Sequence, residues 1–169
     1  MERTHVSLRG IAIALRLDFK ARTGVDIVPG HVLFGWMMRH AGWSHTRYQT
    51  RGPRSTTAFE ARRGHAYKSP IVPFGELVMI RIAIDPPGLR KKLDSNWMKG
   101  AWVGRMDEND ANIVLTKDGI VTGKSVRRLT PELRYQKQII DELRGLVSDP
   151  ALSQAQLLKL LPHSVPIRL

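Results

Sequence analysis

The clearest hydrophobic pattern in this chain is an alternating one. Between residues 77 and 84 every second side chain is branched and apolar, and this period of two predicts a β-strand. Shorter apolar runs follow at residues 100–104, 112–116 and 119–126, and Lys117-Asp118-Gly119 between the last two has the composition of a hairpin turn. Four or five short strands within about sixty residues predict a small antiparallel barrel or sandwich.

The chain before residue 70 has helical periodicity instead. Residues 2–23 place Leu8, Ile11, Leu15 and Phe19 at helical spacing and predict an amphipathic helix that ends at Gly24. A second helix is predicted over residues 31–44, followed by a basic loop over residues 47–54. Thr57 and Glu60 then form a capping-box sequence, which predicts a short helix that stops at Gly64.

After the predicted barrel, the sequence turns helical again. Thr130-Pro131-Glu132 is a strong helix start and predicts a helix to about Leu146, with a further short helix over residues 149–162. We therefore predict an α+β protein in three segments. These are a helical segment at residues 1–68, a β-barrel at residues 69–129, and a C-terminal helix with a tail at residues 130–169.

Charge narrows the function classes. The 169 residues carry a formal net charge of +12, and residues 1–70 hold 12 Lys and Arg against 4 Asp and Glu. This excess predicts a polyanionic partner, either nucleic acid or, as the lesser possibility, an anionic membrane surface. The chain has no cysteine, which excludes disulfides, cysteine zinc sites and thiol catalysis, and no apolar run is long enough to span a membrane. The sequence predicts a soluble intracellular protein with no membrane contact.

The candidate phosphate contacts are basic residues in the helical segment and at the end of the barrel. They are Arg9, Arg16, Lys20, Arg51, Arg54, Arg62, Arg63, Lys124, Arg127 and Arg128. Two interpretations of such residues are open, a row of phosphate contacts or an ordinary solvated surface. For Trp97 and Trp102 the alternatives are stacking on bases and packing in the barrel core.

The sequence favours no metal site. His40 and His45 do not have the spacing of two ligands on one helical turn, and no carboxylate accompanies them. Asp107, Glu108 and Asp110 form an acidic cluster, which we interpret as a turn because these side chains bond their own backbone. We expect no bound metal and no cofactor.

Several segments, taken in order, resemble one family. They are residues 36–43, Arg47-Tyr48, residues 57–60 with Gly64, Tyr67, Phe74-Gly75-Glu76 and Val78, Lys92-Leu93-Asp94, Trp97, residues 100–104, Asp118-Gly119, and Arg127-Arg128-Leu129. The series resembles the integrase region of copia-like retrotransposon Pol polyproteins and covers roughly residues 31–129. It implies the end of a ribonuclease-H-like catalytic core, followed by an SH3-like barrel that contacts DNA.

The resemblance also implies what this chain lacks. Such cores hold two Asp and one Glu that bind divalent metal, and Glu2 is similar to that Glu by its place before a long helix, although an unremarkable N-terminal Glu fits as well. The strands that would carry the two Asp are missing from this chain, and two-metal phosphoryl transfer needs several carboxylates. Magnesium or manganese would be expected only with an intact core. Without the strands of that core, the apolar faces of the first two helices are expected to lack a partner.

Three functions follow. The first is a non-catalytic integrase fragment that binds DNA or RNA without sequence preference and acts in the nucleus if it behaves as its relatives do. The second is a protein-interaction module, in which the barrel and the C-terminal helix dock on a polyprotein or chromatin partner, or on another copy of the chain. The third is an active subunit whose missing carboxylates come from a partner chain.

Overall fold

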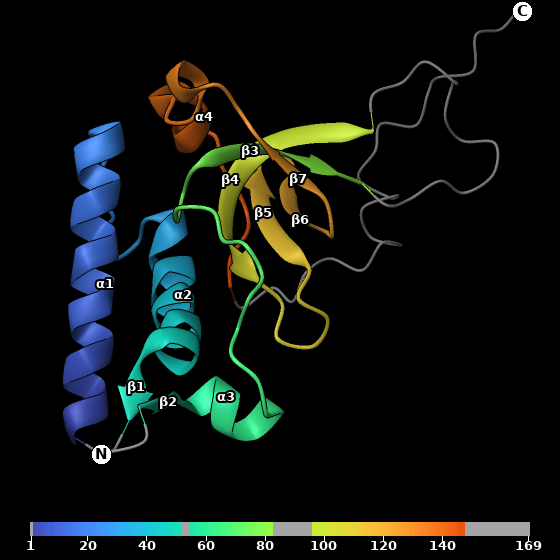
Figure 1. The fold of residues 1–169 in the computed structure, drawn as a ribbon. Coiled ribbons are helices and arrows are strands. Elements are labelled where there is room, and N and C mark those ends of the chain that lie inside the picture. Colours follow the sequence, from blue (N-terminus) through green and yellow to red (C-terminus); the bar gives the residue numbers. More distant parts are fainter. Residues whose placement is uncertain (1, 52–54, 83–95, 148–169) are drawn as a thin grey trace, which may run out of the picture.

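The computed structural model describes residues 2–51, 55–82 and 96–147, and the fold is α+β as predicted. Two long helices, α1 (Glu2–Thr23) and α2 (Val32–Tyr48), precede a five-stranded antiparallel sheet. Helix α2 lies between α1 and the sheet, and the short helix α4 (Lys137–Asp141) covers one end of the strands (Figure 1). The helix predicted over residues 149–162 lies outside the described residues.

Helix α1 has the predicted bounds, because its apolar stripe and its C-terminal stop are both local. Phe19 on the inner face is 1% exposed, while the outer side carries polar residues together with the exposed apolar residues Val6, Ile13 and Leu17. Thr23 donates its hydroxyl to the Phe19 carbonyl, and Gly24, at a φ of 73°, donates its amide to Lys20. A glycine in the left-handed region after the last turn is the usual helix end.

Helix α2 is longer than predicted. Its N-terminus is capped by His31, whose Nδ1 accepts a hydrogen bond from the Leu33 amide. The expected stop at Ser44 and the expected loop from Arg47 are wrong, because the helix continues to Tyr48. Arg47 is 7% exposed and packs among aromatic rings, so tertiary contacts hold the last turn.

The short helix α3 (Ala58–Arg63) confirms the capping-box prediction. The Thr57 hydroxyl accepts a hydrogen bond from the Glu60 amide at 3.1 Å, and Gly64 ends the helix at a φ of 78°. Strands β1 (Thr50–Arg51) and β2 (Thr56–Thr57) pair before it and form a small ribbon. This ribbon fixes α3 at the C-terminal end of α2 (Figure 1).

The main sheet has the strand order β6-β5-β4-β3-β7, with every neighbouring pair antiparallel. Its strands are β3 (Leu77–Arg81), β4 (Trp97–Arg105), β5 (Asn112–Thr116), β6 (Gly119–Gly123) and β7 (Val126–Arg128). Strand β4 begins three residues before the predicted start at residue 100. The apolar run predicted as one strand over residues 119–126 is two, because the chain turns at Lys124 and Ser125 and crosses to pair with β3.

The two faces of the sheet belong to separate apolar cores. One face joins the helices, and the other encloses a cluster of Val72, Val78, Ile80, Trp102, Val114 and Val121. The sheet curls around this second cluster: a Cβ added to Gly123 at the end of β6 would lie 2.7 Å from the Arg81 carbonyl of β3. Only glycine permits this close approach of two non-neighbouring strands.

The helix-facing core crosses the predicted boundary at residue 68. It contains Phe19 of α1, Trp36 and Met37 of α2, and Leu77 and Val103 of the sheet. The expectation that the first two helices lack an apolar partner is therefore wrong for α2, since Trp36 and Met37 are each 3% exposed. The helices and the sheet form one packed unit.

A C-terminal helix is present, as predicted, but it is much shorter than the predicted residues 130–146. This segment holds only a single 3-10 turn (Pro131–Leu133) and helix α4. Backbone groups of this segment form hydrogen bonds with the sheet instead. Leu77 donates its amide to the Arg134 carbonyl, and Arg144 donates its amide to the Thr116 carbonyl. Ile140 and Leu143 are buried in the helix-facing core, so packing against the sheet overrides the local helical signal.

Candidate nucleic-acid interface

Three cations and a tryptophan lie on one exposed part of the main sheet. Alternation places Arg81 of β3, Trp97 and Lys99 of β4, and Arg127 of β7 on the same face of three adjacent strands. The register sets Arg81 opposite Trp97 and Met79 opposite both Lys99 and Arg127. We call Arg81, Trp97, Lys99 and Arg127 the sheet-face cluster. It lies beyond the part of this face that the helices cover.

The cluster is held together by a cation-π contact. The guanidinium carbon of Arg127 lies 4.4 Å from the centre of the Trp97 ring, so the two side chains reach across β3 to meet. Arg81 and Arg127 are exposed, and Trp97 is half-buried. Lys99 donates to the side-chain oxygen of Gln136 at 2.7 Å and keeps its full charge, since the acceptor is a neutral amide. The cluster therefore brings three positive charges together at the contact between Arg127 and Trp97.

Seven of the predicted phosphate contacts are exposed. Lys20 and Arg128 pair with carboxylates, and the other five are Arg9, Arg62, Arg63, Lys124 and Arg127. Within the described part of the chain, none of the five has an ion pair with a carboxylate. Arg9 is on α1, Arg62 and Arg63 are on α3, Lys124 lies in the turn before β7, and Arg127 is in β7. The five are therefore spread over the fold. Only Arg127 belongs to the sheet-face cluster, and Lys124 precedes it by three residues.

Arg16 and Lys20 share the carboxylate of Asp26. Arg16 binds it with two nitrogens at 2.6 and 3.0 Å, and Lys20 contributes a third contact at 3.0 Å. The hydrogen bonds from Arg16 and then from Lys20 lower the pKa of Asp26 to about 2. These two predicted phosphate contacts therefore already have an anionic partner, which fastens α1 to the segment after it.

Arg128 is bound by a carboxylate of the core. Its Nε and Nη2 donate to the two oxygens of Glu76 at 2.6 and 2.7 Å, and Glu76 is 0% exposed. The hydroxyl of Tyr135 donates to the same carboxylate, and Tyr135 accepts from Arg22 of α1. The hydrogen bond to Glu76 raises the pKa of Arg128. Arg128 thus closes a network between the sheet, α1 and the C-terminal segment.

The remaining predicted residues cannot be placed in the interface. Arg54 lies outside the described residues, as do the side chains of Glu2 and Arg51. The backbone of Glu2 begins α1, and that of Arg51 is in β1.

The two tryptophans for which base stacking was an open alternative differ in their surroundings. Trp102 is 0% exposed, belongs to the core inside the curled sheet, and donates its indole nitrogen to Asn112 at 3.0 Å. It is a core residue. Trp97 is the one at the surface, where Arg127 covers one face of its ring.

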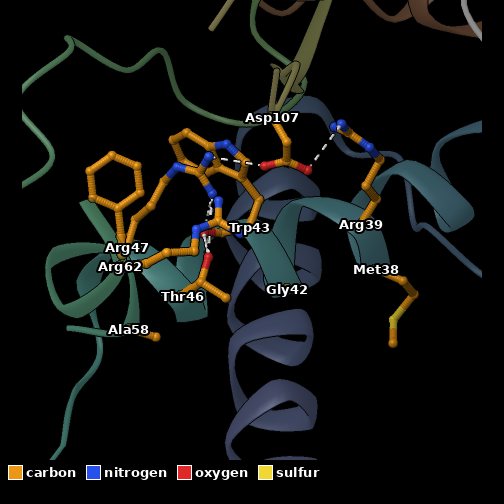
Figure 2. A pocket seen from close by; sticks show the side chains of 10 residues that line it. Met38, Arg39, Gly42, Trp43, Thr46, Arg47, Ala58, Arg62 and Asp107 are labelled. Carbon is orange, nitrogen blue, oxygen red and sulfur yellow. Dashed lines mark hydrogen bonds and ion pairs between the residues drawn. The ribbon is translucent and has the colours of Figure 1, made fainter. Parts of the chain in front are cut away.

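A second basic surface lies where α2, α3 and the turn after β4 meet. A hollow of about 510 Å³ lies there, and Figure 2 shows Arg39, Arg47, Arg62 and Asp107 among the side chains that line it. Arg47 is enclosed by Trp43, Phe59 and Tyr67, whose ring centres lie 4.4, 5.2 and 5.3 Å from its guanidinium carbon.

Most of the positive charges around this hollow already have acceptors within the protein. Arg47 donates to Asp107 at 2.9 Å, and Arg39 donates to the Arg105 carbonyl at 3.0 Å and lies 4.0 Å from Asp107. Only Arg62 adds an exposed charge without an ion pair in the described residues. We therefore regard the hollow as a joint between helices and sheet, and the sheet-face cluster as the stronger anion site.

His40 is buried at the same joint. Its ring stacks on Trp43 and Phe74 at centroid distances of 5.4 Å and meets Trp102 edge-on at 5.3 Å. Burial, with a smaller effect of the neighbouring Arg39, lowers the pKa of His40 to about 4. The ring is therefore neutral near pH 7 and serves packing.

The acidic cluster after β4 is a turn, as interpreted from the sequence. Asp110 has a φ of 57° and accepts from Tyr67, Ser69 and Arg105, and Asn109 accepts from the Ala111 amide. Burial and the hydrogen bond to Asp110 raise the pKa of Tyr67 to about 12. In the described part of the chain, no group of three or more His, Asp and Glu side chains is arranged to hold a metal ion.

The sequence interpretation missed Arg81 and Lys99 as site residues. The alternation over residues 77–84 contained the signal for Arg81, since it placed Arg81 on the face opposite the branched apolar residues. No comparable signal exists for Lys99, because the predicted strand begins only at residue 100. Among the described residues, no helix combines the length and hydropathy needed to cross a lipid bilayer.

The chain was compared with known proteins in three ways. No family model, no curated protein and no solved structure matches it.

Proposed function

We propose that this protein binds the phosphate backbone of DNA or RNA without strong sequence preference and without cutting it, as a segment of the copia-like integrase type. The observation that carries the proposal is the sheet-face cluster, in which Arg81, Lys99 and Arg127 surround Trp97 on an exposed sheet surface. A net charge of +12 adds a long-range attraction for polyanions. In this proposal the curled sheet is an SH3-like barrel, and α1 and α2 are the end of a ribonuclease-H-like core.

Exposed cations elsewhere extend the proposed footprint. Lys124 precedes β7 and adjoins the cluster through Arg127, while Arg62 and Arg63 add charge on α3. Arg16, Lys20 and Arg128 contribute less, because Arg16 and Lys20 share the carboxylate of Asp26 and Arg128 is paired with Glu76. Binding is thus assigned to the sheet face first and to α3 second.

The test is a fluorescence-anisotropy titration of a labelled random-sequence duplex of about 30 base pairs at several salt concentrations. Binding should weaken steeply with salt, with a logarithmic slope of roughly −0.9 for each phosphate contact. Replacing Arg81, Lys99 and Arg127 together by alanine should reduce that slope by about 2 to 3. Lys117→Ala, which removes an exposed charge in the β5–β6 turn, is the matched control and should reduce it by less than 1.

Two results would overturn the proposal. One is the absence of binding at low salt. The other is nicking of the duplex that depends on magnesium or manganese, followed on a gel. Such nicking would instead support the third function, an active subunit whose missing carboxylates come from a partner chain. Loss of nicking in Glu2→Gln would then assign Glu2 to the reaction.

A protein-interaction module is the second candidate, and the outer face of α1 favours it. Val6, Ile13 and Leu17 are 68%, 50% and 60% exposed, and with Gly10 they follow the 4-3-4 spacing of a helix-pairing seam. A complex made through this stripe would survive high salt, unlike phosphate binding. Sedimentation at low and high salt distinguishes the two, since self-association lost on Leu17→Glu but unchanged by salt would support the second candidate.

A further inference from the structure

We infer that the sheet-face cluster binds unpaired bases, so that the preferred ligand is single-stranded DNA or RNA and not a duplex. The inference rests on the proposed function and names the ligand class of that same site. Its starting point is the geometry of Arg127, whose guanidinium lies over the Trp97 ring at 4.4 Å.

The stack has one open end. The guanidinium carbon of Arg127 lies 4.4 Å from the indole centre and Arg127 is exposed, so we infer that the guanidinium rests against the indole with its other face open to solvent. A guanidinium plane is itself a stacking surface for nucleic-acid bases. A base that adds to this face continues a stack of ring, guanidinium and base, and the indole below keeps the guanidinium plane in place.

The positive charges next to Arg127 and Trp97 are placed to bind a single nucleic-acid strand that runs over these two side chains. Arg81 lies opposite Trp97 on the adjacent strand, and Lys99 follows Trp97 two residues along β4 on the same face. Both cations therefore flank the stack at the distance of one or two residues in the sheet. They can contact the phosphates on either side of a stacked nucleotide. Because every base has an aromatic face that can stack, this mode of binding requires no particular nucleotide sequence.

A duplex cannot use this arrangement fully. Its bases are paired and stacked internally, so Arg127 reaches only phosphates and groove edges. A surface that bound phosphates alone would favour the duplex, which has the higher charge density. Preference for the single strand is therefore the signature of base stacking at Arg127.

The experiment compares a labelled oligothymidylate of about 16 nucleotides with a mixed-sequence duplex of about 16 base pairs, at one moderate salt concentration. The full-length protein should bind the single strand on the order of tenfold more tightly. Arg127→Lys keeps the charge and removes the planar surface, so it should weaken single-strand binding more than duplex binding and abolish most of the preference. Lys124→Ala removes a neighbouring charge and should weaken both ligands by similar factors.

Tryptophan emission gives an independent readout. Trp36, Trp43 and Trp102 are 3%, 4% and 0% exposed, whereas Trp97 is half-buried, so a soluble quencher should act mainly on Trp97. The single strand should protect this emission from the quencher in the unmodified protein and protect it less in Arg127→Lys. Circular dichroism of both variants checks that the fold is retained.

The possible outcomes separate the two claims. Single-strand preference that is lost in Arg127→Lys supports the inference. Equal or tighter duplex binding, with no effect of Arg127→Lys, overturns it and leaves the proposed function intact. No binding of either ligand at low salt overturns both.

Discussion

Arg128 donates two hydrogen bonds to the buried carboxylate of Glu76, from Nε at 2.6 Å and from Nη2 at 2.7 Å. The sequence alone predicts that Arg128 contacts phosphate, but its pairing with Glu76 gives Arg128 a structural role. Glu76 is 0% exposed, and without Arg128 its carboxylate would keep only the hydrogen bond from Tyr135 and a looser ion pair with Arg134 at 3.7 Å.

We expect Arg128→Ala to lower the free energy of unfolding by about 2 to 3 kcal/mol, a value below that for fully buried pairs because Arg128 itself is half-exposed. Urea denaturation followed by circular dichroism measures it. Adding Glu76→Gln to Arg128→Ala should recover part of the loss, since no buried charge then remains. An Arg128→Ala protein as stable as the parent would show that the pair is not needed.

Arg47 should be the key residue of the joint between helices and sheet. It is 7% exposed, lies over Trp43 at 4.4 Å and pairs with Asp107. Arg47→Ala removes the cation-π contacts and the ion pair and should cost about 2 to 4 kcal/mol of stability. Arg62→Ala, an exposed arginine beside the same hollow, should change stability by less than about 0.5 kcal/mol. Equal effects in urea denaturation would mean that the enclosure around Arg47 adds nothing.

A substitution at Gly75 tests whether α1 packs on the segment that leads into β3. Its φ is 77°, and a Cβ at this position would lie 2.3 Å from Cε2 of Phe19. Gly75→Ala should therefore suffer both backbone strain and overpacking, whereas Gly30→Ala, at a φ of 95° with open space around it, suffers the strain alone. We expect Gly75→Ala to be the less stable by about 1 to 3 kcal/mol in thermal or urea unfolding. Equal losses would contradict the close contact between α1 and Gly75.

His40 should make stability depend on pH. Its pKa is about 4 in the folded protein and near 6.5 when unfolded, so the unfolded chain binds the extra proton first as pH falls. Its contribution is complete above pH 6.5, is lost between pH 6.5 and 4, and amounts to about 2 to 3 kcal/mol.

The measurement is urea denaturation across this pH range. His40→Phe keeps a ring between Trp43 and Phe74 but binds no proton, so its stability should vary less over the same interval. His65→Gln, at an exposed site, should leave the pH profile unchanged. Asp26, with a folded pKa of about 2, loses its contribution at lower pH, between about 4 and 2, and does not obscure the test.

Local signals in the sequence were sufficient for several elements. The stripe of α1, the Thr57 cap and Gly64 stop of α3, and the limits of β5 all follow from residues within a few positions of one another. The same reliance on local signals made the helix predicted after Thr130 too long, since only Lys137–Asp141 is α-helical there. Its start signal is local, but Ile140 and Leu143 gain more by packing on the sheet than by continuing a regular helix.

By itself, the sequence determined the basic charge, the alternation of β3 and the helical stripes, because composition and periodicity need no knowledge of distant partners. The tertiary structure decided which cations are available to a ligand. Arg128 meets Glu76 from 52 residues away, Arg47 meets Asp107 from 60, and Arg127 meets Trp97 only because β4 and β7 both pair with β3. A charge is neutralised by what lies next to it in space, and that neighbour is set by strand register and packing.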